Sequence, residues 1–315
     1  MEKIKVGTLD INNFVLGAGR LGEEERKKEC FNILDRYLDM CYNTLDVARS
    51  YSDGRAEEFL GEYLKNKRRE DVILISKGGF PLSRKEMYKT RLSEKELRKD
   101  IEASLKALNT NYIDLYFLHR DDVSVPPEEM LETVNKFVQE GKVREIGASN
   151  WSCGRIAQAN SYAEKNGLNK FQASQINYSL ALTTPPLTGD ITHVVMNDVE
   201  YRWYKETDFP IIAYSVQAKG FFSKQYSGKE LKQSGKLSYL PLEENFRRAE
   251  RIKKLSDIKK VPIPALLLSY VLSKDVNSAV IGGFSTVDQL DESESGINIK
   301  LSNKEIDFLE KDSQL

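Results

Sequence analysis

The sequence predicts an α/β fold, a closed (β/α)8 or TIM barrel preceded by a short N-terminal β-hairpin. Eight short apolar segments alternate with segments of helical periodicity, which is the pattern of βα units around a parallel sheet. These strands are apolar throughout, as strands buried on both faces are. Eight such units in 315 residues match the size of a closed barrel. We therefore expect a single domain over residues 1–315.

The hairpin is predicted over residues 3–11, ahead of the barrel. The eight barrel strands are predicted, in chain order, at residues 14–19, 42–46, 72–77, 112–119, 143–150, 171–177, 211–215 and 278–283. Each is short and is bounded by polar or helix-forming sequence, as strands in βα units are.

Helices are predicted after each of the first five strands. In chain order they cover residues 23–40, 55–66, 91–108, 126–140 and 153–166. The first begins with three glutamates, which suit the positive end of a helix. The third carries Ser93 as a cap with Glu96 three residues later, and the fourth opens with two prolines, which a first helical turn accepts.

Two long connections, residues 177–210 and 216–243, follow the sixth and seventh strands. Long irregular loops in a compact domain are usually pocket walls, lids or disordered segments. The connections contain two groups of aromatic residues: Tyr201, Trp203 and Tyr204 in the first, and Phe221, Phe222 and Tyr226 in the second. These side chains either line a pocket or pack the loops onto the barrel.

The composition predicts a soluble, cytoplasmic protein. The net charge is −1, from 47 basic and 48 acidic residues, so no general attraction to nucleic acid or an anionic membrane is expected. The longest apolar run, A-L-L-L-S-Y-V-L, is much shorter than the roughly 20 residues that span a bilayer, and the first residues lack the apolar region of a signal peptide. Cys30, Cys41 and Cys153 are interpreted as buried free thiols without metal-ligand spacing. The oligomeric state stays open.

A doubly wound sheet is the alternative fold. It would usually carry a glycine-rich dinucleotide turn, and G-A-G-R-L-G at residues 17–22 resembles such a turn by its letters. A match of this kind is weak by itself, and no separate acidic residue ends the following strand apart from Asp46. The barrel is therefore preferred.

Four polar side chains stand at or just after the ends of three successive strands. Asp46, Lys77 and His119 end the second, third and fourth predicted strands, and Tyr51 lies in the loop after the second. The carboxyl ends of parallel barrel strands form one rim, where barrel enzymes have their active sites. We therefore expect these four groups to share one pocket.

The motifs around these residues resemble the aldo-keto reductase family over nearly the whole chain. Taken singly each match is weak, but together they follow the family's order. The matching features are D-V-A-R-S-Y at 46–51, Lys77 and His119 at their strand ends, G-A-S-N-W at 147–151, A-Y-S-V-Q-A-K-G-F-F at 213–222, and I-G-G-F-S-T-V-D-Q-L-D-E-S at 281–293.

The resemblance implies a catalytic tetrad whose chemistry can be stated physically. Carbonyl reduction by hydride transfer leaves charge on oxygen, so a proton donor is needed there. Tyr51 is the implied donor, and a neighbouring ammonium such as that of Lys77 stabilises the phenolate form of a phenol. Asp46 would keep the buried ammonium charged, and His119 would orient the carbonyl oxygen by a hydrogen bond. His193, in a long loop, is interpreted as a surface residue.

A nicotinamide cofactor lying across the rim is also implied, NADP(H) in most of the family, with NAD(H) as the alternative. The motifs assign its binding to Ser149, Asn150 and Gln175 at the carboxamide, Tyr214 at the ring, Ser215 at the pyrophosphate, and Gly283, Gln289, Glu292 and Ser293 at the adenosine. No metal is implied, since the rim has one histidine and lacks a His-x-His pair.

Several positions depart from the family pattern. Ser52 stands in place of a glycine, Val216 and Gln217 in place of Pro-Leu, and Gly282 in place of a proline. Residues 284–293 contain no lysine or arginine, although a 2′-phosphate is usually bound by a cation. Weak discrimination between NADPH and NADH is therefore expected, unless Lys219 or Lys224 reaches the site.

Two functions remain to be distinguished. The first is an NAD(P)H-dependent oxidoreductase that reduces a small aldehyde, ketone or sugar, or oxidises the alcohol. The alternative is a barrel that binds the cofactor as a regulatory subunit with little turnover, which the presence of all four tetrad residues disfavours. A metal-dependent hydrolase is a third reading that lacks ligands.

Overall fold

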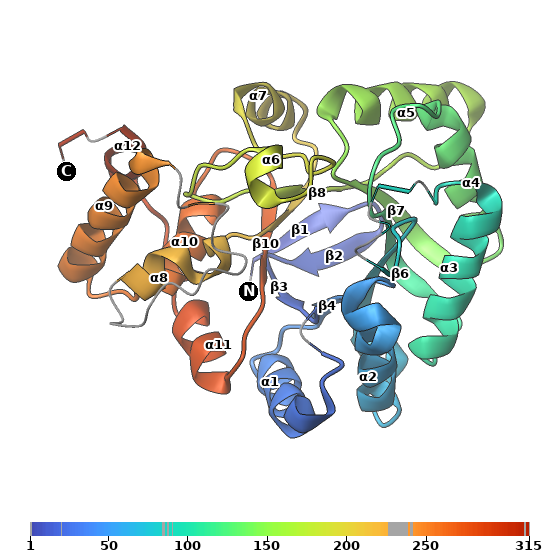
Figure 1. Ribbon diagram of the computed structural model, residues 1–315, viewed down its shortest axis with the longest axis horizontal. Coiled ribbons are helices and arrows are strands. Elements are labelled where there is room, and N and C mark those ends of the chain that lie inside the picture. The colour runs from blue at the N-terminus through green and yellow to red at the C-terminus, as the bar shows by residue number, and fades with distance from the viewer. Residues whose placement is uncertain are drawn as a thin grey trace.

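In the computed structural model, the described residues are 2–19, 21–83, 86, 88–89, 91–225, 239, 242–311 and 313–314. Within them, parallel strands close into a barrel in the order β10-β3-β4-β5-β6-β7-β8-β9 (Figure 1). The strands are β3 (Phe14–Gly17), β4 (Thr44–Asp46), β5 (Ile73–Gly78), β6 (Ile113–Leu118), β7 (Val143–Ser149), β8 (Ser174–Asn177), β9 (Ile211–Tyr214) and β10 (Ser278–Gly282). The predicted barrel is therefore confirmed.

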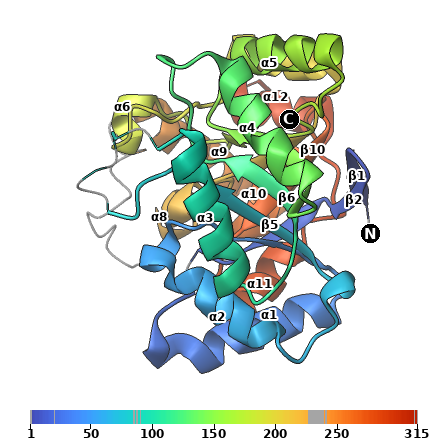
Figure 2. The ribbon, with the colours of Figure 1, turned by 90° about the vertical axis from the view of Figure 1, so that its right-hand side faces the viewer.

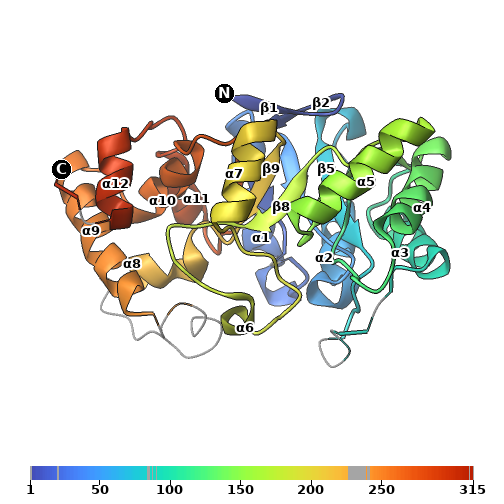
Figure 3. The ribbon, with the colours of Figure 1, turned by 90° about the horizontal axis from the view of Figure 1, so that it is seen from above.

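The predicted hairpin consists of β1 (Lys3–Val6) and β2 (Leu9–Asn12), which pair antiparallel. Its apolar side chains Val6 and Ile11 are fully buried and belong to one cluster with interior barrel residues such as Val15 and Leu115. The hairpin thus covers one end of the barrel. Helix α6 (Pro185–Thr188) lies at the opposite end, as Figures 2 and 3 show.

Helices surround the barrel and bury a second cluster between themselves and the strands. Those after the first five strands are α1 (Lys27–Asp39), α2 (Arg55–Leu64), α3 (Glu94–Ala107), α4 (Pro127–Gln139) and α5 (Cys153–Asn166). All five were predicted, with ends that differ by no more than four residues. Ser93 caps α3 as predicted, because its side chain accepts a hydrogen bond from the backbone N–H of Glu96 at 3.4 Å.

The later part of the chain contains helices that were not predicted. They are α6, α7 (Asp198–Thr207), α8 (Phe221–Gln225), α9 (Glu243–Lys259), α10 (Ile263–Leu272), α11 (Val287–Glu294) and α12 (Asn303–Lys311). The apolar run noted above forms most of α10, which is buried all round. No helix in the described ranges is long and apolar enough to cross a membrane.

The aromatic residues of the long connections pack onto the barrel. Tyr204 in α7 is fully buried, and its hydroxyl donates to Ser174 Oγ at 2.8 Å. Phe221 and Phe222 in α8 are also fully buried. Of the predicted group, Tyr226 lies outside the described residues.

All three cysteines are free thiols, as predicted. Cys30 and Cys153 are buried, but Cys41 is exposed, so the prediction of burial was wrong there. The reason is local: Cys41 follows the end of α1 on left-handed backbone, with φ of 63°.

Candidate active site

The ends of β4, β5 and β6 bring the four predicted tetrad residues together. Lys77 Nζ donates to Asp46 Oδ1 at 2.7 Å, to Val47 O at 2.9 Å and to the Tyr51 hydroxyl at 3.3 Å. The His119 ring lies edge-on to the Tyr51 ring, with 5.7 Å between centroids. The three bonds satisfy all three N–H groups of the ammonium, which is fully buried.

The electrostatics of the tetrad fix its protonation states at neutral pH. Burial disfavours the charged form of Lys77, but the adjacent charge of Asp46 outweighs it and the pKa of Lys77 is raised. Burial, assisted by the charges of Arg120 and Lys77, lowers the pKa of His119 well below its ordinary value. Lys77 is therefore a cation and His119 a neutral imidazole, whose Nδ1 lies 3.4 Å from Ser50 Oγ.

One elongated cleft of about 900 Å³ begins at the tetrad and runs to the start of α11. This volume lies at the upper end of the range for small-molecule sites. The predicted site residues in its wall are Asp46, Tyr51, His119, Ser149, Asn150, Gln175, Tyr214, Ser215, Gly283, Gln289, Glu292 and Ser293. Lys77, the remaining predicted residue, lies in contact with Asp46 and Tyr51 but does not line the cleft.

The amide-bearing residues next to the tetrad are held by one another. Gln175 Nε2 donates to the second carboxylate oxygen of Asp46 at 2.8 Å. Tyr214 donates its hydroxyl to Asn150 Oδ1 at 2.6 Å, and Asn150 Nδ2 donates to Ser149 Oγ at 3.0 Å. Gln175 thus satisfies a buried carboxylate, a contact that motif matching does not reveal.

Left-handed backbone conformations are concentrated around the cleft. Ser52, Asn150, Ser215 and Lys219 have φ between 51° and 59°, and the last three line the cleft. Each such non-glycine residue costs roughly 1–3 kcal/mol and is typical of functional sites. Ser52, which departs from the family glycine, adopts this conformation and donates its hydroxyl to Leu21 O at 2.7 Å. This bond fixes the loop after β3 beside the tyrosine.

The far end of the cleft fits an anionic group. It is formed by the first turn of α11, where Thr286 caps the helix by accepting from Gln289 N. Backbone N–H groups at a helix start favour negative charge. Arg26 Nη2 donates to Ser285 O at 2.9 Å, so a cation lies beside this turn. The same cleft is lined by Tyr51 at the tetrad and by Ser285 and Gln289 at this turn.

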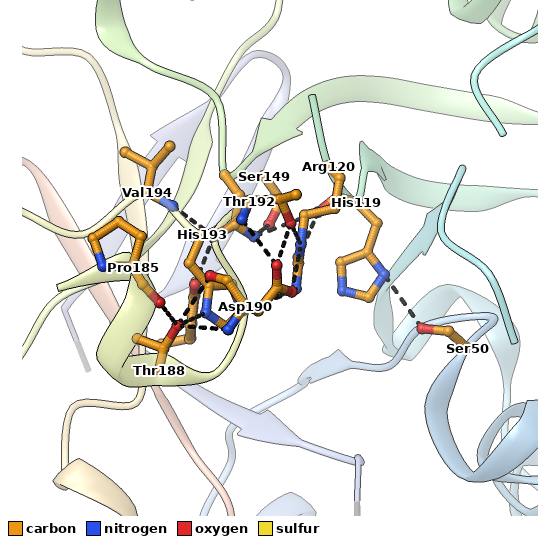
Figure 4. A network of polar contacts seen from close by, with 12 residues as sticks. Ser50, His119, Arg120, Ser149, Pro185, Thr188, Asp190, Thr192, His193 and Val194 are labelled. Carbon is orange, nitrogen blue, oxygen red and sulfur yellow. Dashed lines mark hydrogen bonds and ion pairs between the residues drawn. The ribbon is translucent and has the colours of Figure 1, made fainter. Parts of the chain in front are cut away.

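Three residues of the site were missed from the sequence. Figure 4 shows Arg120 between the end of β6 and the loop after β8, where it pairs with Asp190 at 3.0 Å. His193 Nε2 lies 2.9 Å from Arg120 Nη2. Arg120 and His193 line the cleft, so the interpretation of His193 as a surface residue was wrong. Arg120 and Asp190 are 70 positions apart in the sequence, so no local pattern indicates that they form a pair.

Acid destabilisation is expected from the histidines. Burial, assisted by the charge of Arg120 and opposed by Asp190, lowers the pKa of His193 from 6.5 to about 4, and the pKa of His119 is lowered too. The unfolded state binds more protons below pH 6.5, so stability is present above that pH and is lost as pH falls towards 4. From His193 alone we expect a loss of about 1 kcal/mol between pH 7.5 and pH 5.5.

Urea unfolding at the two pH values measures this effect. His193→Gln removes one titrating group, so its unfolding free energy should depend less steeply on pH than that of the native protein. An equal pH dependence in both proteins would contradict the assignment of a neutral, buried His193.

In the described part of the chain, no group of three or more His, Cys, Asp and Glu side chains could hold a metal ion. A closed βα barrel with a paired ammonium and carboxylate beside a phenol at one end of its cleft fits an NAD(P)-dependent oxidoreductase. The model of the Aldo/keto reductase family matches residues 13–312. The chain belongs to the aldo-keto reductase family.

Curated relatives cover nearly the full chain. Norsolorinic acid reductase B of Aspergillus parasiticus is 28% identical, over 98% of this chain and 81% of its own length. A putative aryl-alcohol dehydrogenase of Saccharomyces cerevisiae is 27% identical, over 99% of this chain and 96% of its own. A thermostable aldo-keto reductase, solved with the inhibitor epalrestat, superposes with a TM-score of 0.76 at 23% identity, covering 98% of this chain and 97% of that one. This last likeness concerns the fold.

Proposed function

We propose that this protein reduces the carbonyl group of a small aldehyde, ketone or sugar with NAD(P)H, or oxidises the alcohol, and that Asp46, Tyr51, Lys77 and His119 carry the reaction. One observation carries the assignment. A buried ammonium lies 2.7 Å from a carboxylate and 3.3 Å from a phenol that lines the cleft. A lysine with a purely structural role would not require a hydrogen bond to a phenol that lines the ligand cleft.

The side chains of this protein would donate the proton and orient the carbonyl group, while the bound reduced nicotinamide would supply the hydride. Tyr51 donates its phenolic proton to the carbonyl oxygen as negative charge develops there. The Lys77 ammonium at 3.3 Å stabilises the phenolate that remains. His119 is neutral, and because Ser50 contacts Nδ1, its Nε2 is the nitrogen left to bind the carbonyl oxygen.

The residues proposed for the cofactor follow the cleft. Ser149, Asn150 and Gln175 would bind the carboxamide, and Tyr214 would stack on the ring. Beyond the ring, Ser215 would contact the pyrophosphate, and a final set would hold the adenosine: Gly283, Gln289, Glu292 and Ser293. Their shared position in one wall supports this set.

Aromatic carbonyl compounds are the first substrates to test. One relative is named as an aryl-alcohol dehydrogenase. In this chain the Phe80 and Tyr51 rings lie next to the His119 ring, with centroid distances of 5.3 Å and 5.7 Å, so two aromatic rings flank the imidazole. A panel of aryl aldehydes, aliphatic aldehydes and aldoses with NADPH tests this, and the highest kcat/KM is expected for an aryl aldehyde. Equal rates across the panel would remove the aromatic preference.

Cofactor preference is expected to be modest, with NADPH favoured over NADH by less than a hundredfold, about 2.7 kcal/mol. Residues 284–293 contain no cation, but Lys219 and Lys224 both line the cleft, and Arg26 lies beside Ser285. Fluorescence titrations with both cofactors at low and moderate salt measure the ratio. Arg26→Met should weaken NADPH binding roughly tenfold and leave NADH binding unchanged, because only the 2′-phosphate needs the charge.

Lys28→Met is the matched control, since it removes a positive charge two residues further along, from an exposed position in the first turn of α1. A loss of NADPH affinity as large as that of Arg26→Met would show a general charge effect. A preference above a hundredfold that survives Arg26→Met would place the recognising cation elsewhere.

A cofactor-binding regulatory subunit is the second candidate. It would bind NADPH but give no turnover with any member of the carbonyl panel.

A cytoplasmic location is also proposed, because all three cysteines are free thiols, as in proteins of a reducing compartment.

A further inference from the structure

Arg120 follows the tetrad histidine and joins the end of β6 to the loop after β8. Its Nη1 donates to the backbone oxygen of His119 at 2.7 Å. Its Nη2 and Nε donate to Asp190 Oδ2 at 3.0 and 3.3 Å. The Arg120 and Asp190 side chains are only 12% and 7% exposed. An ion pair so shielded from water is stronger than a surface pair, and removing one partner leaves a buried charge.

His193 completes this arrangement as a neutral acceptor. The Thr188 hydroxyl lies 2.7 Å from Pro185 O and therefore donates there. It then accepts from His193 Nδ1–H at 2.7 Å, which leaves the Nε2 lone pair to accept from Arg120 Nη2. Arg120 Nε also donates to Thr192 Oγ1 at 3.0 Å, so Arg120 is bonded to three residues of one segment, 185–194 (Figure 4).

The same segment also contacts the nicotinamide end of the proposed cofactor site. The backbone N–H of Val194 donates to Asn150 Oδ1 at 3.3 Å, and the Tyr214 hydroxyl donates to the same oxygen. Asn150 Nδ2 in turn lies 3.4 Å from the backbone oxygen of His119. The segment thus contacts Asn150, which would hold the nicotinamide, and is joined through Arg120 to His119, which would hold the carbonyl.

We propose that the Arg120–Asp190 pair fixes the segment 185–194 against the ends of β6 and β7 and thereby sets the distance between carbonyl and nicotinamide. Arg120 is a positioning residue, which acts through His119 and Asn150. The proposal rests on the proposed function. It explains why a full ion pair is buried beside a tetrad that is already electrically balanced by Lys77 and Asp46.

A displacement of about 1 Å at reacting atoms can cost about a hundredfold in rate. In Arg120→Met the hydride-transfer rate in a single turnover at saturating NADPH should fall roughly 10- to 100-fold. The affinity for NADPH should change much less. Arg120→Lys keeps the charge but lacks the planar fork, so it should recover only part of the rate. Asp190→Asn should be impaired similarly.

Arg155→Met is the matched control. Arg155 forms a similarly buried ion pair with Asp121 at 2.6 Å near the same rim, with 20% and 10% exposure, but it does not line the cleft. Thermal unfolding of both methionine variants reports the purely structural cost of losing an ion pair. The expected result is a similar loss of stability in both, with the slow hydride step confined to Arg120→Met.

The kinetic isotope effect with NADPH deuterated at C4 separates the outcomes. In Arg120→Met the isotope effect on turnover should rise, because the hydride step becomes more rate-limiting. A hydride rate in Arg120→Met within about twofold of Arg155→Met would overturn the positioning role. Failure of the proposed function is distinct, since the unmodified protein would then transfer no deuterium at all.

Discussion

Tyr51→Phe is expected to lower the rate of carbonyl reduction by roughly 10²- to 10⁴-fold, which is the usual contribution of a general acid. The variant keeps the aromatic ring that lies edge-on to His119 and loses only the hydroxyl that Lys77 contacts at 3.3 Å. Cofactor affinity should therefore remain within a few-fold of the native value. Steady-state kinetics and fluorescence titration measure the two quantities separately.

Tyr112→Phe is the control for this change. Tyr112 lies just before β6, at the end of the barrel opposite the cleft, where its ring packs between Arg69 and Arg144. The turnover of the Tyr112→Phe variant should equal that of the native protein. Near-native turnover in Tyr51→Phe would remove the phenol from the mechanism.

Lys77→Met should have the second large effect, because it acts on both activity and stability. The variant leaves the Asp46 carboxylate buried without its cation, which typically costs about 3–5 kcal/mol of stability. It also removes the charge that stabilises the phenolate, so turnover should fall by roughly 10² or more. Urea unfolding and steady-state kinetics measure the two losses.

The double variant Lys77→Met with Asp46→Asn separates these effects. Neutralising the carboxylate removes the unpaired charge, so most of the stability should return while turnover stays low. If the double variant recovered turnover together with stability, Lys77 would be a structural residue and the tetrad assignment would fail.

The barrel and its tetrad could be predicted from sequence for one physical reason. Each βα unit can be recognised by a short apolar segment followed by a segment of helical periodicity. Asp46, Lys77 and His119 each stand at the end of such an apolar segment. Once the strands are parallel neighbours, their ends must share a rim. Pairing in the barrel follows this order, with Asp46 opposite Ile75 and Lys77 opposite Phe117.

The remainder of the site depends on contacts between distant positions. Arg26 meets Ser285 across 259 residues, and Arg120 meets Asp190 across 70. Neither pair has a local sequence pattern, because the two partners become neighbours only when the barrel closes. The helices after the sixth and seventh strands escaped prediction for a related reason: the intervals there are long and irregular, and only the completed barrel shows which side is buried.

Deuterium transfer tests the central claim most directly. NADPH carrying deuterium at C4 is incubated with the protein and an aryl aldehyde, and the alcohol is analysed by NMR for deuterium at the carbinol carbon. A family oxidoreductase with this tetrad should give deuterated alcohol with the native protein and roughly 10²- to 10⁴-fold less with Tyr51→Phe. Normal NADPH binding without deuterium in any alcohol of the carbonyl panel would contradict the enzymatic role and favour a regulatory barrel.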